Sequence, residues 1–395
     1  MRGIFILLAS LFSLPTMAII TSFSESEVAL MHTVFSQHQS DFTRHSTQAR
    51  LNENQYLLAQ AHKHQPRLLT RQADVGYATV FHTRRYVLSL LKSHFTDINL
   101  PSAPKIDWSL YTKTALLADL PPYPNDNQYS PMQLTQLESI NLAPLTGMPF
   151  TLAELMLEQS MQNRYKLHQG DYALFKKLIG DIRQYHHLVT SLATHLTHSG
   201  IALKHLNLIA AGELLRSPML NYFGVQSHMH GERSPYLEAL KRKITHSDIT
   251  AFYVKNKADF KHKSRVTASG VLFSTSQAAT AFKQVAQATS FKKALKQYAL
   301  KSIFSDTQGK ITRKQNSQWV HQVVFSLKES LLTGPIRSPD GKWLVAQTHH
   351  IKFDYYAIDS ETVKYQATLA LIEDLAQQTY RQNKQAWLKT HKLSL

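Results

Sequence analysis

The chain has 395 residues, which is long enough for two or three domains, and 43% of them are apolar, which suffices for packed cores. Lysine and arginine number 44 against 27 aspartates and glutamates. The resulting net charge of +17 favours acidic polymers, anionic lipid head groups or acidic unfolded chains as partners. Without cysteine we expect neither a disulfide framework nor a lipoprotein anchor. No helix-turn-helix, zinc-finger or glycine-rich RNA motif stands out, so nucleic acid is not an expected partner.

Residues 1–18 have the pattern of a secretory signal peptide. Arg2 gives a positive start, an apolar run covers residues 4–14, and Ala18 ends a small-residue cleavage site. Pro15 interrupts the apolar run, so a spanning helix that anchors the chain in the inner membrane is the less favoured alternative. We therefore expect export, most simply to the periplasm.

Residues 19–98 form an N-terminal segment with a helical pattern, in which Pro66 separates two predicted helices. Eight prolines then accumulate in residues 99–150. We interpret this part as a proline-rich connection, a hinge or an arm around one helix at 108–117, rather than as a core element.

Residues 151–262 are predicted to be a second helical region. Thr151 and Glu154 form a capping box, and Thr245 and Asp248 form another that starts a helix from Ile249. Like residues 19–98, this region is expected to be mostly helical.

Residues 263–355 change to a mixed pattern. A strand rich in β-branched residues covers 265–273, a helix with apolar residues at helical spacing covers 276–286, and a second short helix begins near Phe291. A further short helix leads to a strand around 334–336, a turn at 338–341 and a last strand at 343–347.

Residues 356–395 are predicted to form a long C-terminal helix. It begins at Asp359-Ser360, and its apolar residues fall on one stripe: Tyr365, Leu369, Ile372, Ala376 and Tyr380. This stripe needs a partner surface, and we expect it to pack on helices before residue 250.

The order strand–helix–helix–strand–turn–strand resembles a parvulin-type (PpiC-like) peptidyl-prolyl cis-trans isomerase domain. The closing run Phe325–Gly341 carries the resemblance, as does the helix Ile249–Phe260, which is similar to the one that leads into this domain in SurA-like, PpiD-like and PrsA-like envelope foldases. The resemblance implies an α+β chain: a mostly helical N-terminal chaperone-like domain, a small parvulin-like α/β domain at 263–355, and a C-terminal helix that returns to the N-terminal helices.

The same resemblance implies a degenerate active site. In parvulins two histidines, on the first and last strands, lie in the middle of the site. Their positions fall here on Gly270 and Trp343, so no catalytic residue is assigned. His321, on the helix expected to line the pocket, is a minor candidate for a substitute ring.

The resemblance implies that the pocket for a proline-containing peptide is better preserved than the two histidine positions. Its apolar positions fall on Trp319 or Val320 and on Val324 or Phe325, and Leu272 and Trp343 could complete the lining. The alternative interpretation is that these are ordinary core residues of a small domain. This alternative is weaker for the two tryptophans, because large amphipathic rings favour binding surfaces.

The 21 histidines do not suggest a metal site or a cofactor. The closest groups lack zinc-enzyme spacing: His62/His64, His186/His187, His228/His230 with Glu232, and His349/His350.

Two functions remain open: a chaperone-like foldase that binds unfolded or proline-containing segments of envelope proteins with weak or lost isomerase activity, and an isomerase with a rearranged site. We expect Gly270 and Trp343 to lie side by side at an open groove in either case.

Overall fold

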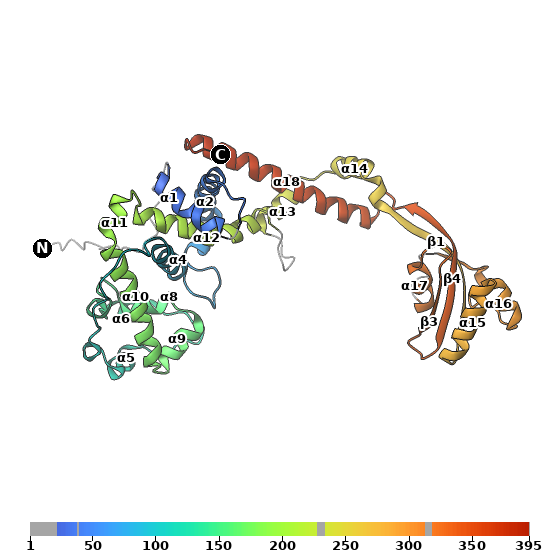
Figure 1. The fold of residues 1–395 in the computed structure, drawn as a ribbon, viewed down its shortest axis with the longest axis horizontal. Coiled ribbons are helices and arrows are strands. Elements are labelled where there is room, and N and C mark those ends of the chain that lie inside the picture. Colours follow the sequence, from blue (N-terminus) through green and yellow to red (C-terminus); the bar gives the residue numbers. More distant parts are fainter. Residues whose placement is uncertain (1–21, 38, 227–233, 313–317, 395) are drawn as a thin grey trace. The chain divides into compact units, whose positions relative to one another are not determined.

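The computed structural model describes residues 22–37, 39–226, 234–312 and 318–394, so the expected signal peptide lies outside the described residues. The chain divides into two units, one made of residues up to Glu238 together with Leu375–Leu395, the other of Ala239–Asp374. Figure 1 shows the helices of the first unit and the single sheet of the second. The predicted α+β class, with a helical N-terminal part, a small sheet domain and a returning C-terminal helix, is confirmed.

The helical unit is built from short and medium helices. They are α1 (Glu25–Ser36), α2 (Arg44–His64), α3 (Pro66–Thr70), α4 (Thr79–His94), the 3-10 turn η1 (Trp108–Leu110), α5 (Lys113–Asp119), α6 (Pro131–Glu138), α7 (Ala143–Thr146), α8 (Leu152–Glu158), α9 (Met161–His168), α10 (Tyr172–Ser191), α11 (Ala193–His198) and α12 (Leu203–Tyr222). Helices α13 (Pro235–Lys241) and α18 (Glu361–Thr390) each have residues in both units.

Side-chain caps fix where the predicted helices begin. Thr151 accepts a hydrogen bond from the backbone N–H of Glu154, and the Glu154 carboxylate accepts from the Thr151 N–H at 2.7 Å, which starts α8. Thr245 and Asp248 make the same reciprocal pair at the start of α14 (His246–Lys255). Both predicted capping boxes are confirmed, because each satisfies two N–H groups that the first helical turn leaves unpaired.

The proline-rich segment is not a hinge or an arm, and that interpretation is wrong. Leu116, Leu137 and Leu142 are fully buried in one apolar cluster with residues of α8 and α10. The single helix expected at 108–117 is instead η1 and α5, because the Thr112 side chain accepts from the Ala115 N–H and starts a new helix there. Pro131 and Pro144 lie in the first turns of α6 and α7, where a missing N–H costs nothing, and the other six prolines lie outside helices and strands.

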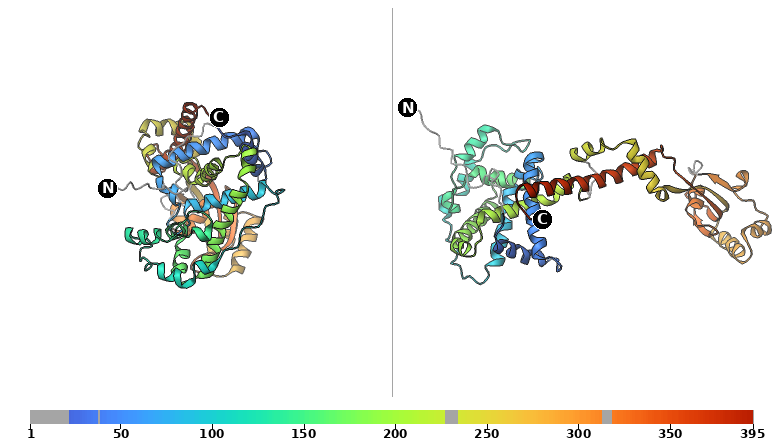
Figure 2. Two further views of the ribbon diagram at one scale, coloured as in Figure 1. Left: turned by 90° about the vertical axis from the view of Figure 1, so that its left-hand side faces the viewer. Right: turned by 90° about the horizontal axis from the view of Figure 1, so that it is seen from above.

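The end of α18 packs on α2 and α12. Tyr380 is buried against Tyr56 and Phe223, with ring centroids 5.7 and 5.6 Å apart, and the red end of α18 lies beside blue α2 in both views of Figure 2. Of the expected apolar stripe, Ile372, Ala376 and Tyr380 are buried, whereas Tyr365 is 64% exposed. The stripe is thus covered only in its second half.

Glu53 of α2 joins this end of α18 to α12 by accepting from two side chains of α18 and one of α12. Its carboxylate accepts from the Tyr380 hydroxyl at 2.8 Å, from Lys384 Nζ at 2.8 Å and from Arg216 of α12. Burial by itself raises the pKa of Glu53, but the positive charges of Arg216 and Lys384 outweigh it and lower the pKa. The stabilisation is therefore present at neutral pH and is lost as the pH falls through the lowered value.

Replacing Glu53 with glutamine is expected to lower the free energy of unfolding of the helical unit by about 1–3 kcal/mol at pH 7, because two cations lose their charged acceptor. Hydrogen exchange should quicken first in residues 375–394. The control is Glu361→Gln, since Glu361 is exposed and, among the described residues, pairs with Lys364 of its own helix alone. Equal exchange rates at 375–394 in both variants would contradict the prediction.

The second unit is organised around a four-stranded antiparallel sheet of order β2-β1-β4-β3. The unit contains α14, η2 (Lys257–Phe260), β1 (Lys261–Phe273), α15 (Ser276–Ala288), α16 (Phe291–Gln297), η3 (Ser305–Thr307), β2 (Lys310–Thr312), α17 (Trp319–Ser326), β3 (Leu332–Arg337) and β4 (Trp343–Tyr355). Helix α17 lies on one face of the sheet, and α15 and α16 lie on the other (Figure 1).

The sequence anticipates most of this unit. The predicted turn at 338–341 is present: the Gly341 N–H donates to the Ser338 carbonyl at 3.0 Å, and Gly341 has φ of +84°. Pro335 lies in β3, an edge strand, where the absent N–H costs no hydrogen bond within the sheet. The three-residue strand β2 was not expected, because so short a run leaves no periodic pattern.

Candidate functional site

Alternation along β1 and β4 produces two separate apolar faces. The face under α17, which we call the α17 face, has a buried core at Val266, Ala268, Phe304, Ile311, Val324, Leu344, Ala346 and Ile351. The opposite face, the α15 face, has Val271, Ala279, Phe282, Ala286, Phe291, Ala294 and Val345. Successive strand side chains point to opposite faces, so Leu344 and Val345 belong to different clusters.

Two side chains hold α17 in place over its face. Lys263 of β1 donates from Nζ to the carbonyl oxygens of Phe325 and Leu327 at 2.8 and 2.7 Å, and the buried Thr348 of β4 donates to the Val324 carbonyl at 2.8 Å. These carbonyls lie at the C-terminal end of the helix, where no backbone N–H is left to pair with them. The helix is therefore fixed against both central strands.

Half-buried apolar side chains surround this core. Of the residues predicted to bind a peptide, Leu272, Trp319, Val320 and Phe325 lie together on the α17 face and are partly accessible. Val324 is fully buried and belongs to the core, as the alternative interpretation had it. Val323 joins the accessible set and was missed, although its spacing of four from Trp319 would have placed it on the same side of a helix.

Trp343 lies on the opposite face. It packs at the edge of the α15 face and pairs across the strands with Phe273, whereas Gly270 pairs with Ala346 on the α17 face. The expectation that Gly270 and Trp343 lie side by side is therefore wrong. On the last strand, Leu344 and Ala346 face the same way as Gly270, and Leu344 directly follows Trp343.

The space above Gly270 is filled, so the expectation of an open groove at this position is wrong as well. A Cβ at this position would stand 2.9 Å from Cε2 of Phe304 and 3.4 Å from two atoms of Ile303. Phe304 is only 3% exposed, so its ring has little room to move. The backbone holds this arrangement, since the Ile303 N–H donates to the Gly270 carbonyl at 2.9 Å and the Gly270 N–H donates to Ser302 Oγ at 3.1 Å.

Of the histidines, His321 is the one that α17 brings to this region. Its ring lies 5.7 Å from that of Phe304, and it is half-buried. Within the described ranges no group of three or more His, Asp or Glu side chains could hold a metal ion, and His228, His230 and Glu232 lie outside those ranges. Within the same ranges no helix is long and apolar enough to cross a membrane.

Residues 244–355, from the start of α14 to the end of β4, match the family model of the PPIC-type PPIASE domain. The resemblance of this part of the chain to a parvulin-type isomerase domain is thereby confirmed. No curated protein matches the chain.

Several solved structures are similar to the chain at low identity. PrsA, a peptidylprolyl isomerase of Bacillus anthracis, is 17% identical over 52% of this chain and 83% of its own, with a TM-score of 0.21. One of two SurA-like chaperones of Campylobacter jejuni, PEB4 and Cj1289, is 18% identical over 69% and 98%, with a TM-score of 0.23. The foldase PrsA of Streptococcus pneumoniae is 14% identical over 57% and 77%, with a TM-score of 0.21.

Proposed function

We propose that the chain is a foldase-type chaperone whose PPIC-type domain binds unfolded or proline-containing polypeptide segments with weak or no isomerase activity. The binding surface is the half-buried rim of the α17 face, where Leu272, Trp319 and Phe325 supply apolar contacts. Side chains of this kind favour binding because they bury apolar area at a low conformational cost.

The observation that carries the part of the proposal about weak or no isomerase activity is the filled space above Gly270. Rotation about an X–Pro bond must cross a barrier of about 20 kcal/mol, and an enzyme lowers it by favouring the twisted amide with positioned polar groups. Here Phe304 and Ile303 occupy the place where a side chain on Gly270 would stand, and Leu344 is fully buried beside them. This centre offers apolar contact rather than hydrogen bonds to the amide.

An active isomerase with a rearranged site is the second candidate. The observation in its favour is His321, whose half-buried ring lies on the same face of the sheet, next to Phe304. In this case the imidazole would supply the polar contact that the strand positions do not. The His321→Ala variant separates the two functions, because only an isomerase of this kind would lose its activity with that ring.

We also propose that the chain acts in the cell envelope, most simply the periplasm, on envelope polypeptides. The pattern of residues 1–18 supports export, and the net charge of +17 supports contact with acidic chains or an anionic membrane surface. N-terminal sequencing of the protein from an envelope fraction tests this: a mature start at Ile19 is expected, and an intact Met1 in the cytosol would contradict it.

The test of activity compares two assays on the same full-length protein. We expect no measurable acceleration of cis-trans exchange in a short proline peptide, together with suppressed aggregation of an unfolded envelope protein. Each missing polar contact is worth about 1–3 kcal/mol in a dry site, or roughly tenfold or more in rate. Acceleration equal to that of an ordinary parvulin, abolished by His321→Ala, would establish the second candidate instead.

A further inference from the structure

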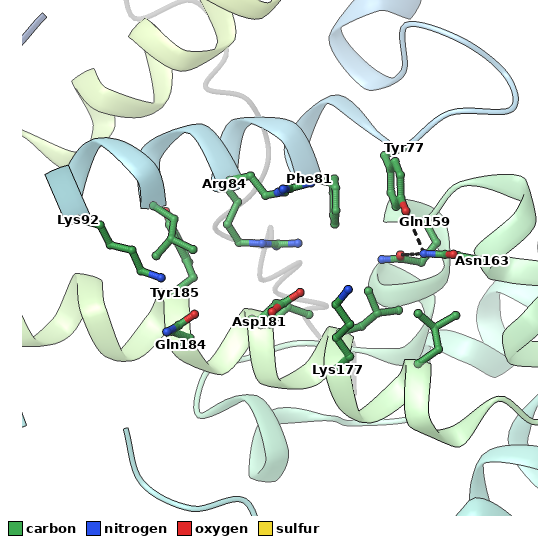
Figure 3. A pocket seen from close by; sticks show the side chains of 15 residues that line it. Tyr77, Phe81, Arg84, Lys92, Gln159, Asn163, Lys177, Asp181, Gln184 and Tyr185 are labelled. Carbon is green, nitrogen blue, oxygen red and sulfur yellow. Dashed lines mark hydrogen bonds between the residues drawn. The ribbon is translucent and has the colours of Figure 1, made fainter. Parts of the chain in front are cut away.

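The helical unit contains a groove of its own between α4 and α10. Its cavity volume is about 390 Å³, a size that holds a few side chains. Figure 3 shows Phe81 and Arg84 reaching from α4, and Lys177 and Asp181 reaching from α10, into the space between the two helices. All of its lining residues lie between Tyr77 and Tyr185, so the groove belongs to the helical unit alone.

The floor and one wall of the groove are apolar. Leu178, Ile182 and Tyr185 are buried along α10, and the rings of Tyr77 and Phe81 stack with centroids 4.2 Å apart. This stacked pair remains half-buried. An apolar side chain of a bound molecule could therefore lie against the two rings and exclude water.

One end of the groove is polar and ordered. Asn163 of α9 donates from Nδ2 to the Tyr77 hydroxyl at 3.1 Å and to Gln159 Oε1 at 3.2 Å, the two bonds drawn in Figure 3. Side-chain amides carry both donors and acceptors, so they suit the peptide groups of an extended chain. Their mutual hydrogen bonds fix them before any ligand arrives.

The rim carries more positive than negative charge. Arg85, Lys92 and Lys177 are exposed around the groove, against the one carboxylate of Asp181. No described residue forms an ion pair or a hydrogen bond with the side chains of Lys92 and Lys177. Arg84 is different, because the buried Glu158 balances its charge from behind.

We propose that this groove binds an extended polypeptide segment in which an acidic side chain stands next to aliphatic or aromatic ones. The proposal rests on the chaperone function proposed above and adds a second binding site with its own preference. The apolar floor takes the apolar side chains, the half-buried amide of Asn163 takes a peptide group, and either Lys92 or Lys177, which Figure 3 shows on opposite sides of Asp181, takes the carboxylate. Complementary charge selects among otherwise similar segments.

The experiment measures binding of two fluorescent peptides to the full-length protein by anisotropy. Both peptides have the same leucine and phenylalanine positions, but one carries glutamates where the other carries lysines. We expect the acidic peptide to bind about tenfold more tightly, and this preference to shrink as salt is added. Equal affinities for the two peptides would overturn the proposal.

A charge-reversal variant locates the site. Lys92→Glu with Lys177→Glu should weaken binding of the acidic peptide about tenfold or more. The matched control is Lys204→Glu, an exposed lysine of α12 that does not line the groove, and it should bind like the unmodified protein. Because all three lysines are exposed, the variants should unfold at the same temperature as the unmodified protein. Equal unfolding temperatures show that the variants are folded. Unchanged affinity in the double variant would overturn the proposal.

The two proposals can fail separately. A protein that suppresses aggregation but ignores the acidic peptide would sink the groove proposal and leave the chaperone function standing. A protein that does neither would sink both. If the double variant loses binding to anionic lipid vesicles while its peptide affinity is unchanged, the charged rim serves a membrane surface and not a polypeptide.

Discussion

Replacing Arg84 with methionine should lower the free energy of unfolding of the helical unit by about 3–5 kcal/mol at pH 7, because a buried carboxylate then loses its charged partner. Arg84 of α4 donates to both oxygens of Glu158 at the end of α8, and the two side chains are only 7% and 6% exposed. Methionine keeps most of the side-chain volume, so the loss reports mainly on the charge.

The loss of stability in Arg84→Met should depend on pH, in a direction that follows from the pKa of Glu158. Burial raises the pKa of this carboxyl, and Arg84 counteracts the shift only in part. Without the Arg84 guanidinium the pKa of Glu158 rises further, so at acidic pH Glu158 is buried in its uncharged form. A carboxyl whose pKa is raised in the folded state destabilises the fold as the pH rises above its unfolded pKa, and the full destabilisation is reached above its folded pKa. The Arg84→Met variant should therefore differ less from the unmodified protein at pH 5 than at pH 7.

Denaturant unfolding at the two pH values measures this difference. The neighbouring Arg85→Met is the control, because Arg85 is exposed and its guanidinium lies over the Phe81 ring rather than against an acid. It should change stability by less than about 1 kcal/mol. A deficit for Arg84→Met that is the same at pH 5 and pH 7 would show that lost packing, and not the buried charge, is responsible.

The features that the sequence predicts well are local. The capping boxes at Thr151 and Thr245 are confirmed because both partners lie within one helical turn and no distant contact is needed. The strand at 265–273 and the turn at 338–341 follow in the same way from β-branched runs and from Pro-Asp-Gly. The resemblance to the parvulin pattern also names Trp319, Val320 and Phe325, and all three pack against the core of the α17 face.

Strand register is where the sequence fails at the site. Residue-by-residue comparison with the parvulin pattern puts the last-strand position on Trp343, but a shift by one residue in a strand moves a side chain to the other face. In the structure Phe273 pairs with Trp343 and Leu272 with Leu344, which decides the face of each side chain. This register depends on how β1 and β4 meet across the sheet. The sequence shows that Trp343 and Leu344 point to opposite faces of the sheet, but it does not show which of the two faces α17.

Long-range packing accounts for the other misses. Phe304 comes from a segment without a periodic pattern, and only its hydrogen bonds to β1 reveal that it lies over Gly270. The prolines of 99–150 suggested a loose connection, yet Leu116 and Leu137 are buried by helices that come later in the chain. The groove between α4 and α10 joins residues separated by about a hundred positions, which no local signal links.

Replacing Gly270 with histidine is expected to destabilise the sheet unit by about 3 kcal/mol, because the new side chain must displace the buried Phe304 ring. Phe304→Ala should cost about 3–5 kcal/mol by leaving a cavity. Since the two changes act on the same space, the double variant should be more stable than their sum predicts by about 1–3 kcal/mol. Strict additivity in denaturant unfolding would contradict the contact between positions 270 and 304.

A third substitution in this double variant tests the proposal that the PPIC-type domain has weak or no isomerase activity. Adding Leu344→His to Gly270→His and Phe304→Ala places two imidazoles on the α17 face, at diagonal positions of β1 and β4, since Gly270 pairs with Ala346 and Leu344 with Leu272. We expect this triple variant to accelerate cis-trans exchange of a proline peptide by about tenfold over the Gly270→His/Phe304→Ala parent. The matched control carries Trp343→His instead, which puts the second ring on the α15 face, and it should gain nothing. Equal gains in the two triple variants would contradict the assignment of Leu344 to the site.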